Sequence, residues 1–121
     1  GGICDIWIHD CVVRGTERGI RIKSMRGRGG YVKRINVERM QMDEIEKEAI
    51  EVSMNYGSST AMPVSQKAPE FSEIRFAHIR GNHAAVGVSL CGLPESPLRE
   101  LTLEDVVIDA EDPLREEYVE K

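Results

Sequence analysis

Cysteine is scarce in this sequence, and the cysteines that occur are not spaced for a closed metal or redox site. Three are present, Cys4, Cys11 and Cys91, and no two of them form a CxxC pair. A disulfide framework, a structural zinc site or a thioredoxin-like site needs an even set or a closely spaced pair. We therefore expect no metal and no other cofactor in this chain.

Long apolar runs are also missing. No stretch approaches the roughly 18 residues that a membrane-spanning helix needs, although hydrophobic residues make up 40% of the chain and charged residues 31%. The sequence begins Gly1-Gly2-Ile3, without an initiator methionine and without the basic and apolar segments of a signal peptide. We expect a folded chain with no membrane partner that is a fragment of a longer protein.

Aromatic residues amount to only 5% of the chain, which limits the partners that its charge suggests. The net charge is −5, yet nine basic residues and two acids lie between Arg14 and Arg39. Such a concentration favours a polyanionic partner, nucleic acid or an acidic polysaccharide, and the alternative is a solvated basic face. Because Trp7 and Tyr31 are the only stacking groups in or near this segment, we predict an acidic polysaccharide and no nucleic acid.

A repeated hydrophobic spacing organises the sequence. Apolar residues follow steps of two, three and two residues from Ile6, from Ile35 and from Leu101, and the run from Ile74 ends with Gly81 in the last place. Shorter alternating stretches, at 20–22, 50–54 and 86–90, follow the copies that begin at Ile6, Ile35 and Ile74. Period-two patterns in short runs predict strands with one face inward.

The intervals between the copies predict a solenoid. Successive copies begin 29, 39 and 27 residues apart, a period at which structural repeats stack on one another. Two or three short strands per turn, each about 4.8 Å from its counterpart in the next turn, make a right-handed single-stranded parallel β-helix. We predict an all-β solenoid of about four coils over residues 1–109, part of a longer β-helix, and an acidic cap or tail over 110–121.

Two segments interrupt this pattern. The stretch "MDEIEKEAI", 42–50, contains good helix formers and predicts a turn, or a single helical turn, at a corner of a coil. The stretch 55–71 is rich in Ser, Pro and Ala and accounts for the longest interval. We interpret it as an inserted loop, which either borders a binding site or is merely tolerated.

The strand "GIRIK", 19–23, holds the main candidates for binding. With Ile20 and Ile22 inward, Arg21 and Lys23 point outward on one face, roughly 6.6 to 7 Å apart. Two cations at that separation can hold one carboxylate, such as that of a uronate, the arginine through its planar fork. The alternative needs no ligand, because the repeat places Glu51 over Arg21, where the two can form an ion pair.

The same alignment predicts what lies beside these cations. It places Ser53 over Lys23 and continues the two columns with Gly87 and Ser89. Small residues next to a pair of cations suggest the floor of a groove, and this favours a binding role for the pair.

Three segments carry a resemblance to a known family: "RGIRIKSMRGRGGYVKRINVERMQM", "APEFSEIRF" and "GLPESPLRELTLEDVVI". They resemble the last coils of glycoside hydrolase family 28, the polygalacturonases and related pectin hydrolases, and the resemblance extends from Asp5 to Asp109. It implies a right-handed parallel β-helix, in agreement with the repeat. It also implies that Arg21 and Lys23 bind the substrate carboxylate beside the scissile bond and that Tyr56 lines the cleft.

The resemblance implies an absence as well. Family members hydrolyse by inversion, with aspartates in Asn-Thr-Asp and Asp-Asp motifs followed by Gly-His-Gly, and none of these motifs occurs here. His9 and Asp10, as neighbours in a regular strand, fall on opposite faces and make no catalytic pair. His78 and His83 match no family site and predict surface or turn positions. We expect no catalytic residue in this chain, which is inactive alone.

Two functions fit these observations. The first is the C-terminal part of a polygalacturonase-type hydrolase acting on pectic, uronate-containing polysaccharide, with acid and base supplied by preceding coils. The second is a noncatalytic β-solenoid that binds polysaccharide or has a structural role. An exposed first coil with Ile6, Ile8 and Ile20 at its edge predicts self-association. The resemblance favours a secreted or periplasmic protein.

Overall fold

The computed structural model describes residues 2–23, 30–54, 70–93 and 96–119, and strands account for most of them. The strands are β1 (Gly2–Arg14), β2 (Ile20–Lys23), β3 (Tyr31–Ser53), β4 (Glu70–Cys91) and β5 (Leu101–Glu117). No helix occurs among the described residues. The prediction of an all-β chain is confirmed.

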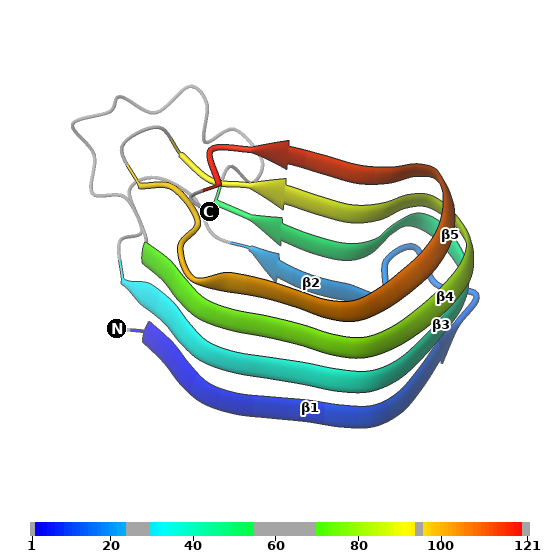
Figure 1. The fold of residues 1–121 in the computed structure, drawn as a ribbon, viewed down its shortest axis with the longest axis horizontal. Helices are drawn as coiled ribbons and strands as arrows, with labels where there is room; N and C mark the ends of the chain where they lie inside the picture. Colours follow the sequence, from blue (N-terminus) through cyan, green and yellow to red (C-terminus); the bar gives the residue numbers. More distant parts are fainter. Residues whose placement is uncertain (1, 24–29, 55–69, 94–95, 120–121) are drawn as a thin grey trace.

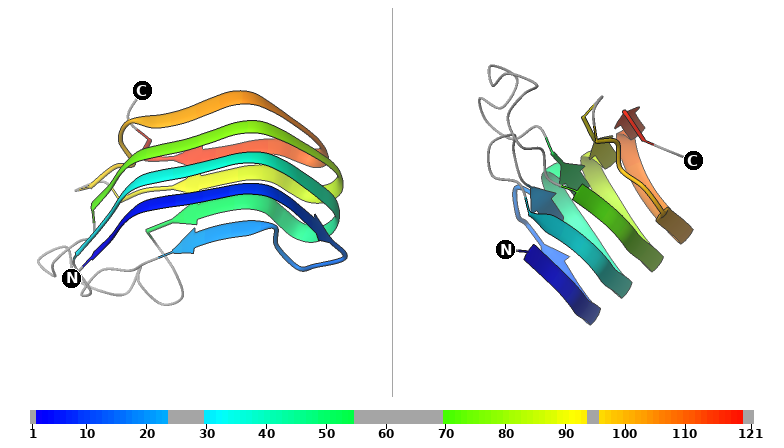
Figure 2. Two further views of the ribbon diagram at one scale, coloured as in Figure 1. Left: turned by 90° about the horizontal axis from the view of Figure 1, so that it is seen from below. Right: turned by 90° about the vertical axis from the view of Figure 1, so that its left-hand side faces the viewer.

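All of these strands pair in parallel within one sheet, in the order β1, β3, β4, β5, and β2 pairs with the later part of β3. The sheet curves back on itself, so each coil has two arms that face each other (Figure 1). The first arm consists of β1 and the parts of β3, β4 and β5 aligned with it. The second arm consists of β2 and the remaining parts. The described coils lie side by side as a stack (Figure 2), which confirms the predicted parallel β-helix.

The strand pairing follows the repeat in the sequence. Ile6 lies beside Ile35, Ile35 beside Ile74, and Ile74 beside Leu101. In the second arm, Ile20 lies beside Ile50. Apolar residues at equivalent positions of the repeat therefore lie beside one another in adjacent coils, as their spacing predicts.

The step of three residues in the repeat has a backbone cause. One residue with positive φ stands at the equivalent place of each coil: Asp10, Arg39, His78 and Asp105, with φ between 53° and 55°. A left-handed residue breaks the strict alternation, so two successive residues project outward before the next apolar one turns inward. A second column of this kind is formed by Asp5, Arg34, Glu73 and Glu100. Both columns consist of charged residues and one histidine, which suits their place on the surface.

The helical turn predicted within 42–50 is wrong, because this segment belongs to β3. The chain does bend there, through Glu44 with φ of 53° and a register shift between Ile45 and Glu48. Ile45 and Ile50 are buried, with 2% and 0% of their surface exposed. Tertiary burial of these side chains outweighs the helix propensity of the residues between them.

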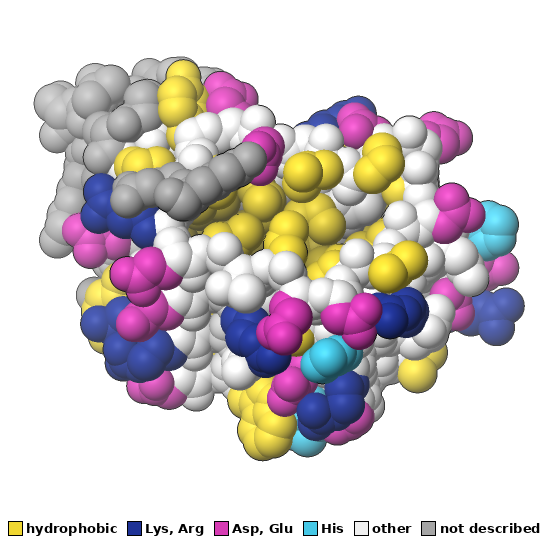
Figure 3. All heavy atoms as spheres, viewed as in Figure 1, with side chains coloured by type: hydrophobic (Ala, Val, Ile, Leu, Met, Phe, Trp, Pro, Cys, Tyr) yellow, Lys and Arg dark blue, Asp and Glu magenta, His cyan; other side chains and the backbone are white. Residues whose placement is uncertain are grey.

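The core lies between the two arms and is best closed in the middle of the stack. Val37 in β3 and Phe76 in β4 are fully buried, whereas Leu103 in β5, next in the same column, is 40% exposed. Figure 3 shows hydrophobic side chains gathered between the arms, with charged side chains around them. Burial therefore depends on having a coil on each side.

The last strand continues beyond residue 109, where the sequence predicts that the coils give way to a tail. Asp112 pairs with Val86 and Glu116 with Leu90, so two carboxylates occupy places that are apolar in β4. The division at 109 does not coincide with the end of a strand. That residues 110–121 act as a cap stays a prediction, which charges on an edge strand support.

The predicted loop 55–71 is described only at its end. Residues 55–69 lie outside the described residues. Glu70 and Phe71 already belong to β4, where they pair with Tyr31 and Val32.

Candidate functional site

Arg21 and Lys23 lie on β2, the shortest of the described strands. Ile20 and Ile22 alternate with them and pack against the core, and Arg21 and Lys23 are exposed. The alternation that the sequence predicts for this strand is therefore present. It places both cations on the outer face of the second arm.

Both cations are engaged within the chain. Arg21 Nε donates a hydrogen bond to Glu51 Oε1 at 2.6 Å, and Lys23 also has contacts. Arg18 extends the cluster, with its Nε 2.7 Å from Glu48 Oε1 and 3.6 Å from Glu51 Oε1. The ion pair that the sequence offers as the alternative to ligand binding thus exists.

The charges of this cluster shift the acidity of its members. Burial and the neighbouring Glu48 raise the pKa of Glu51 above its usual range, against the opposing hydrogen bond from Arg21. Burial acts in the same direction on Glu48, but hydrogen bonds from Arg18 and Glu51 outweigh it and lower the pKa of Glu48. Glu51 is therefore the carboxylate here that most readily takes up a proton, and protonation weakens its hold on Arg21.

The columns beside the cations differ in part from those predicted. Ser53 does lie over Lys23. Glu51 is followed by Ser89, and Ser53 by Cys91. The predicted continuation through Gly87 and Ser89 is wrong by two residues, because a slip of two keeps every side chain on its own face and the hydrophobic pattern cannot detect it. Small residues still adjoin the two cations.

A hollow of about 360 Å³ lies beside the cations, between the arms of the first coil. Its lining is mostly apolar and includes Ile6, Ile8, Ile20 and Ile22, together with Arg21 and Lys23. The cations therefore border the open, apolar end of the core.

Tyr56, the third predicted binding residue, lies outside the described residues, as do Arg26 and Arg28. The structure places Arg21 and Lys23 on one face of β2, and the binding roles of all three residues stay predictions.

Many basic residues between 14 and 39 pair with acids of adjacent coils. Arg34 binds Asp5 through two nitrogens at 2.6 and 3.2 Å. Arg14 lies 3.5 Å from Glu44 in the next coil. The sequence shows a cluster of positive charge, but the register between coils decides which acid pairs with each basic residue. Of these partners, the sequence predicted only Glu51.

His9 and Asp10 contact each other, contrary to the prediction for a regular strand. His9 Nδ1 lies 2.6 Å from Asp10 Oδ2, because the positive φ of Asp10, 55°, interrupts the alternation. Arg39 donates two hydrogen bonds to Asp10, at 2.8 and 3.0 Å. Hydrogen bonds from Arg39 and then from His9 hold the pKa of Asp10 far below its usual range. A carboxylate held in its ionised form is not suited to act as a general acid.

The other histidines occupy bends. His78 Nδ1 lies 2.9 Å from Asp105 Oδ2, and both side chains are about half exposed. His83 has φ of 54° and lines a shallow polar hollow with Asp109 and Glu111. Both positions agree with the surface or turn location predicted for them.

Neither a metal centre nor a membrane-spanning helix is found in the part of the chain that the structure describes. No group of three or more His, Cys, Asp or Glu side chains there is arranged to hold a metal ion. None of its segments is a helix of the length and apolar character that crossing a bilayer requires.

Curated proteins similar to this chain carry consistent names. A protein of Vitis vinifera named probable polygalacturonase is 36% identical over 109 residues, which cover 89% of this chain and 22% of that protein. Two Arabidopsis thaliana proteins, each named probable polygalacturonase, are 26% and 28% identical over 87% of this chain and 24% of their own length. The chain thus spans about a quarter of the length of these relatives. No solved structure matches it.

The family itself is identified by a sequence profile that extends over nearly all of the chain. The profile described as glycosyl hydrolases family 28 matches residues 2–118, which contain β1 to β5 entirely. The matched region includes both cations of β2 and the columns that stack on them. The chain therefore belongs to glycosyl hydrolase family 28.

Proposed function

We propose that this chain is the C-terminal part of a polygalacturonase-type hydrolase that cleaves glycosidic bonds in pectic, uronate-containing polysaccharide. The observation that carries the proposal is the outward pair Arg21 and Lys23, side by side on β2 at the edge of the hollow. Membership of the family and the names of the relatives support the substrate class.

In this proposal Arg21 and Lys23 hold the carboxylate of one galacturonate unit. A guanidinium has five N–H donors, and the contact of Arg21 with Glu51 runs through Nε. A substrate carboxylate can share the guanidinium with Glu51, while Lys23 supplies a second positive charge. Tyr56 lines the same cleft in this proposal.

Hydrolysis proceeds by inversion in this proposal. One carboxylic acid gives its proton to the leaving oxygen, and a carboxylate removes a proton from the water that attacks the opposite face of the sugar. We assign these two groups to coils that precede this chain in the whole protein, because the motifs that carry them do not occur in its sequence.

The test compares substrate binding by four forms of the chain. Arg21→Ala and Lys23→Ala should each weaken binding of a galacturonan hexasaccharide by about tenfold or more, since each removes a charged hydrogen-bonding group. Arg34→Ala serves as the matched control, because Arg34 is an ion-paired arginine of the first arm. Equal affinities for all four forms by calorimetry would refute the binding role.

Catalysis is tested separately. The chain alone should release no reducing ends from polygalacturonate, and the whole protein should release them. Turnover by the chain alone would show that it contains the catalytic acids. A whole protein that binds polygalacturonate without cleaving it would establish the noncatalytic polysaccharide-binding alternative. The internal ion pair of Arg21 favours a structural role for that residue.

A further inference from the structure

Trp7 is exposed and yet fixed in position. It lies on the outer face of the first arm with 57% of its surface accessible. Its Nε1–H donates a hydrogen bond to Glu38 Oε1 at 2.8 Å, and its ring stacks on His9 with centroids 4.1 Å apart. A large aromatic side chain that stays in water, held by a hydrogen bond and a stacked ring, is organised for a partner.

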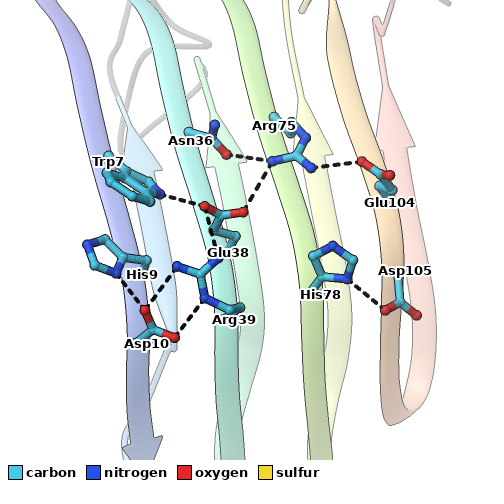
Figure 4. A network of polar contacts seen from close by, with 10 residues as sticks. All are labelled: Trp7, His9, Asp10, Asn36, Glu38, Arg39, Arg75, His78, Glu104 and Asp105. Atoms are coloured by element: carbon cyan, nitrogen blue, oxygen red, sulfur yellow. Dashed lines mark hydrogen bonds and ion pairs between the residues drawn. The ribbon is translucent and has the colours of Figure 1, made fainter.

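The side chains that follow Trp7 toward the end of the stack are polar and mutually bonded. Arg75 donates to Asn36 Oδ1 at 3.0 Å and to Glu104 Oε2 at 2.9 Å, and its Nη1 lies 3.5 Å from Glu38 Oε2. These residues come from successive coils, so the indole and the polar groups form one row across the strands (Figure 4). The amide nitrogen of Asn36 points away from Arg75.

The row carries more carboxylates than arginines, which bears on the ligand. Glu38 and Glu104 lie on either side of Arg75, and Arg39 lies between Glu38 and Asp10. Each arginine already has two carboxylate partners. The carboxylates of the row would therefore repel an anionic ligand. An uncharged ligand rich in hydroxyl groups fits better. A hydroxyl group can donate a hydrogen bond to a carboxylate and accept one from a guanidinium or amide group, so the ligand needs no charge of its own.

The row is also poorly suited to a protein partner. A stable protein interface has a desolvated apolar centre of several residues surrounded by a polar rim. Here a single indole ring stands among ionised and amide side chains.

We propose that Trp7 is the stacking platform of a carbohydrate-binding surface for neutral pyranose units, on the first arm. The C–H face of one sugar lies on the indole, and hydroxyl groups of that sugar and its neighbour bond to Glu38, Asn36 and Arg75. Arg21 and Lys23 lie on the second arm, whose outer face points the other way (Figure 1). The surface therefore works independently of the cation pair, and holds a neutral polysaccharide near the protein.

Trp7 is the only tryptophan in the sequence, so its fluorescence reports on this surface directly. Titration of the chain with a neutral β-1,4-linked galactotetraose should give a saturable change in emission. A galacturonan tetrasaccharide should give no such change at equal concentration. Trp7→Ala should weaken binding of galactotetraose by about tenfold or more in calorimetry, while Trp7→Phe, which keeps a ring but loses the N–H donor, should show a smaller loss.

Arg21→Ala is the matched control and should leave the affinity for galactotetraose unchanged. The proposal is overturned if galactotetraose leaves the emission unaltered, or if Trp7→Ala binds it as tightly as the native chain. It is also overturned if galacturonan alone perturbs Trp7, or if the emission changes with protein concentration in the absence of sugar, which would indicate a protein contact. Far-ultraviolet circular dichroism of each variant confirms the fold.

Discussion

The middle coils and the end coils are built from the same repeat but differ in burial. Val37 and Phe76, in β3 and β4, are fully buried, whereas Ile6 in β1 and Leu103 in β5 are 39% and 40% exposed. The difference lies in the neighbours, since a coil of a solenoid buries its inner face only against the coils on each side. The apolar pattern allows a coil to stack on its neighbours. Its inner side chains are fully buried only when a coil lies on each side.

The two ends also differ from each other. Ile20 and Ile22 occupy the second arm of the first coil, whereas the last coil places Leu114 and Glu116 in the same two columns. An apolar edge accepts another strand and a charged edge discourages one. We therefore expect association at the first coil and not at the last.

The largest expected effect comes from truncating a side chain in the middle of the stack. Phe76→Ala should lower the free energy of unfolding by about 3 to 5 kcal/mol, because it removes buried contacts and leaves a cavity. Leu103→Ala, in the same column of the last coil, should cost about 1 to 2 kcal/mol, since the side chain is already 40% exposed. Urea unfolding of both variants measures the difference. Equal losses would show that burial is uniform along the stack.

The second prediction concerns self-association, which we propose to take place through the first coil. Ile22→Glu should reduce the mean mass measured by light scattering, because it places a charge at the apolar edge. Glu116→Leu should increase that mass, since it gives the last coil the apolar column of β4. If the native chain is monomeric at all concentrations and neither variant alters its mass, the proposed difference between the ends is refuted.

The third prediction concerns acid. Hydrogen bonds with Arg34, Arg39 and His78 respectively lower the pKa values of Asp5, Asp10 and Asp105 from an ordinary value of 3.8. A carboxyl group whose pKa is lower in the folded state contributes stability above its unfolded pKa and loses that contribution as the pH falls toward its folded pKa. Stability should therefore decline progressively below about pH 4.

Arg39→Ala tests the origin of this decline. It removes the first cause of the shift at Asp10, so unfolding free energies of the variant should depend less on pH in that range. An unchanged slope would mean that the ion pairs of the first arm do not produce it.

The smallest expected effect is a change in the pKa of Glu51, the carboxyl group bonded to Arg21. Arg21→Ala removes the hydrogen bond that opposes the raised pKa of Glu51, so the pKa of Glu51 should rise further. Carbon-detected magnetic resonance of the side-chain carboxyl groups measures it. Arg34→Ala, on the other arm, should leave Glu51 unchanged, and a fall in the pKa of Glu51 in the Arg21 variant would contradict the electrostatic account.

Sequence reasoning succeeded where the signal was local. The outward position of Arg21 follows from its place between Ile20 and Ile22, since neighbours in a strand face opposite ways. It was wrong at the columns beyond Glu51, because a slip of two residues preserves every face. At 42–50 the predicted bend is present, but the helical alternative was wrong, because burial of Ile45 and Ile50 against other coils outweighs local propensity.

The sequence by itself determined the strands outside 42–50, the coils and the side chains that face the core, because alternation and repeat length are properties of the chain. Only the tertiary structure decided which charges meet. Arg34 finds Asp5, and Arg21 finds Glu51, across 29 and 30 residues, and left-handed bends bring Asp10 to His9. Ion pairs need contact within a few ångströms, so they depend on the register between coils, which the hydrophobic pattern leaves undetermined in steps of two.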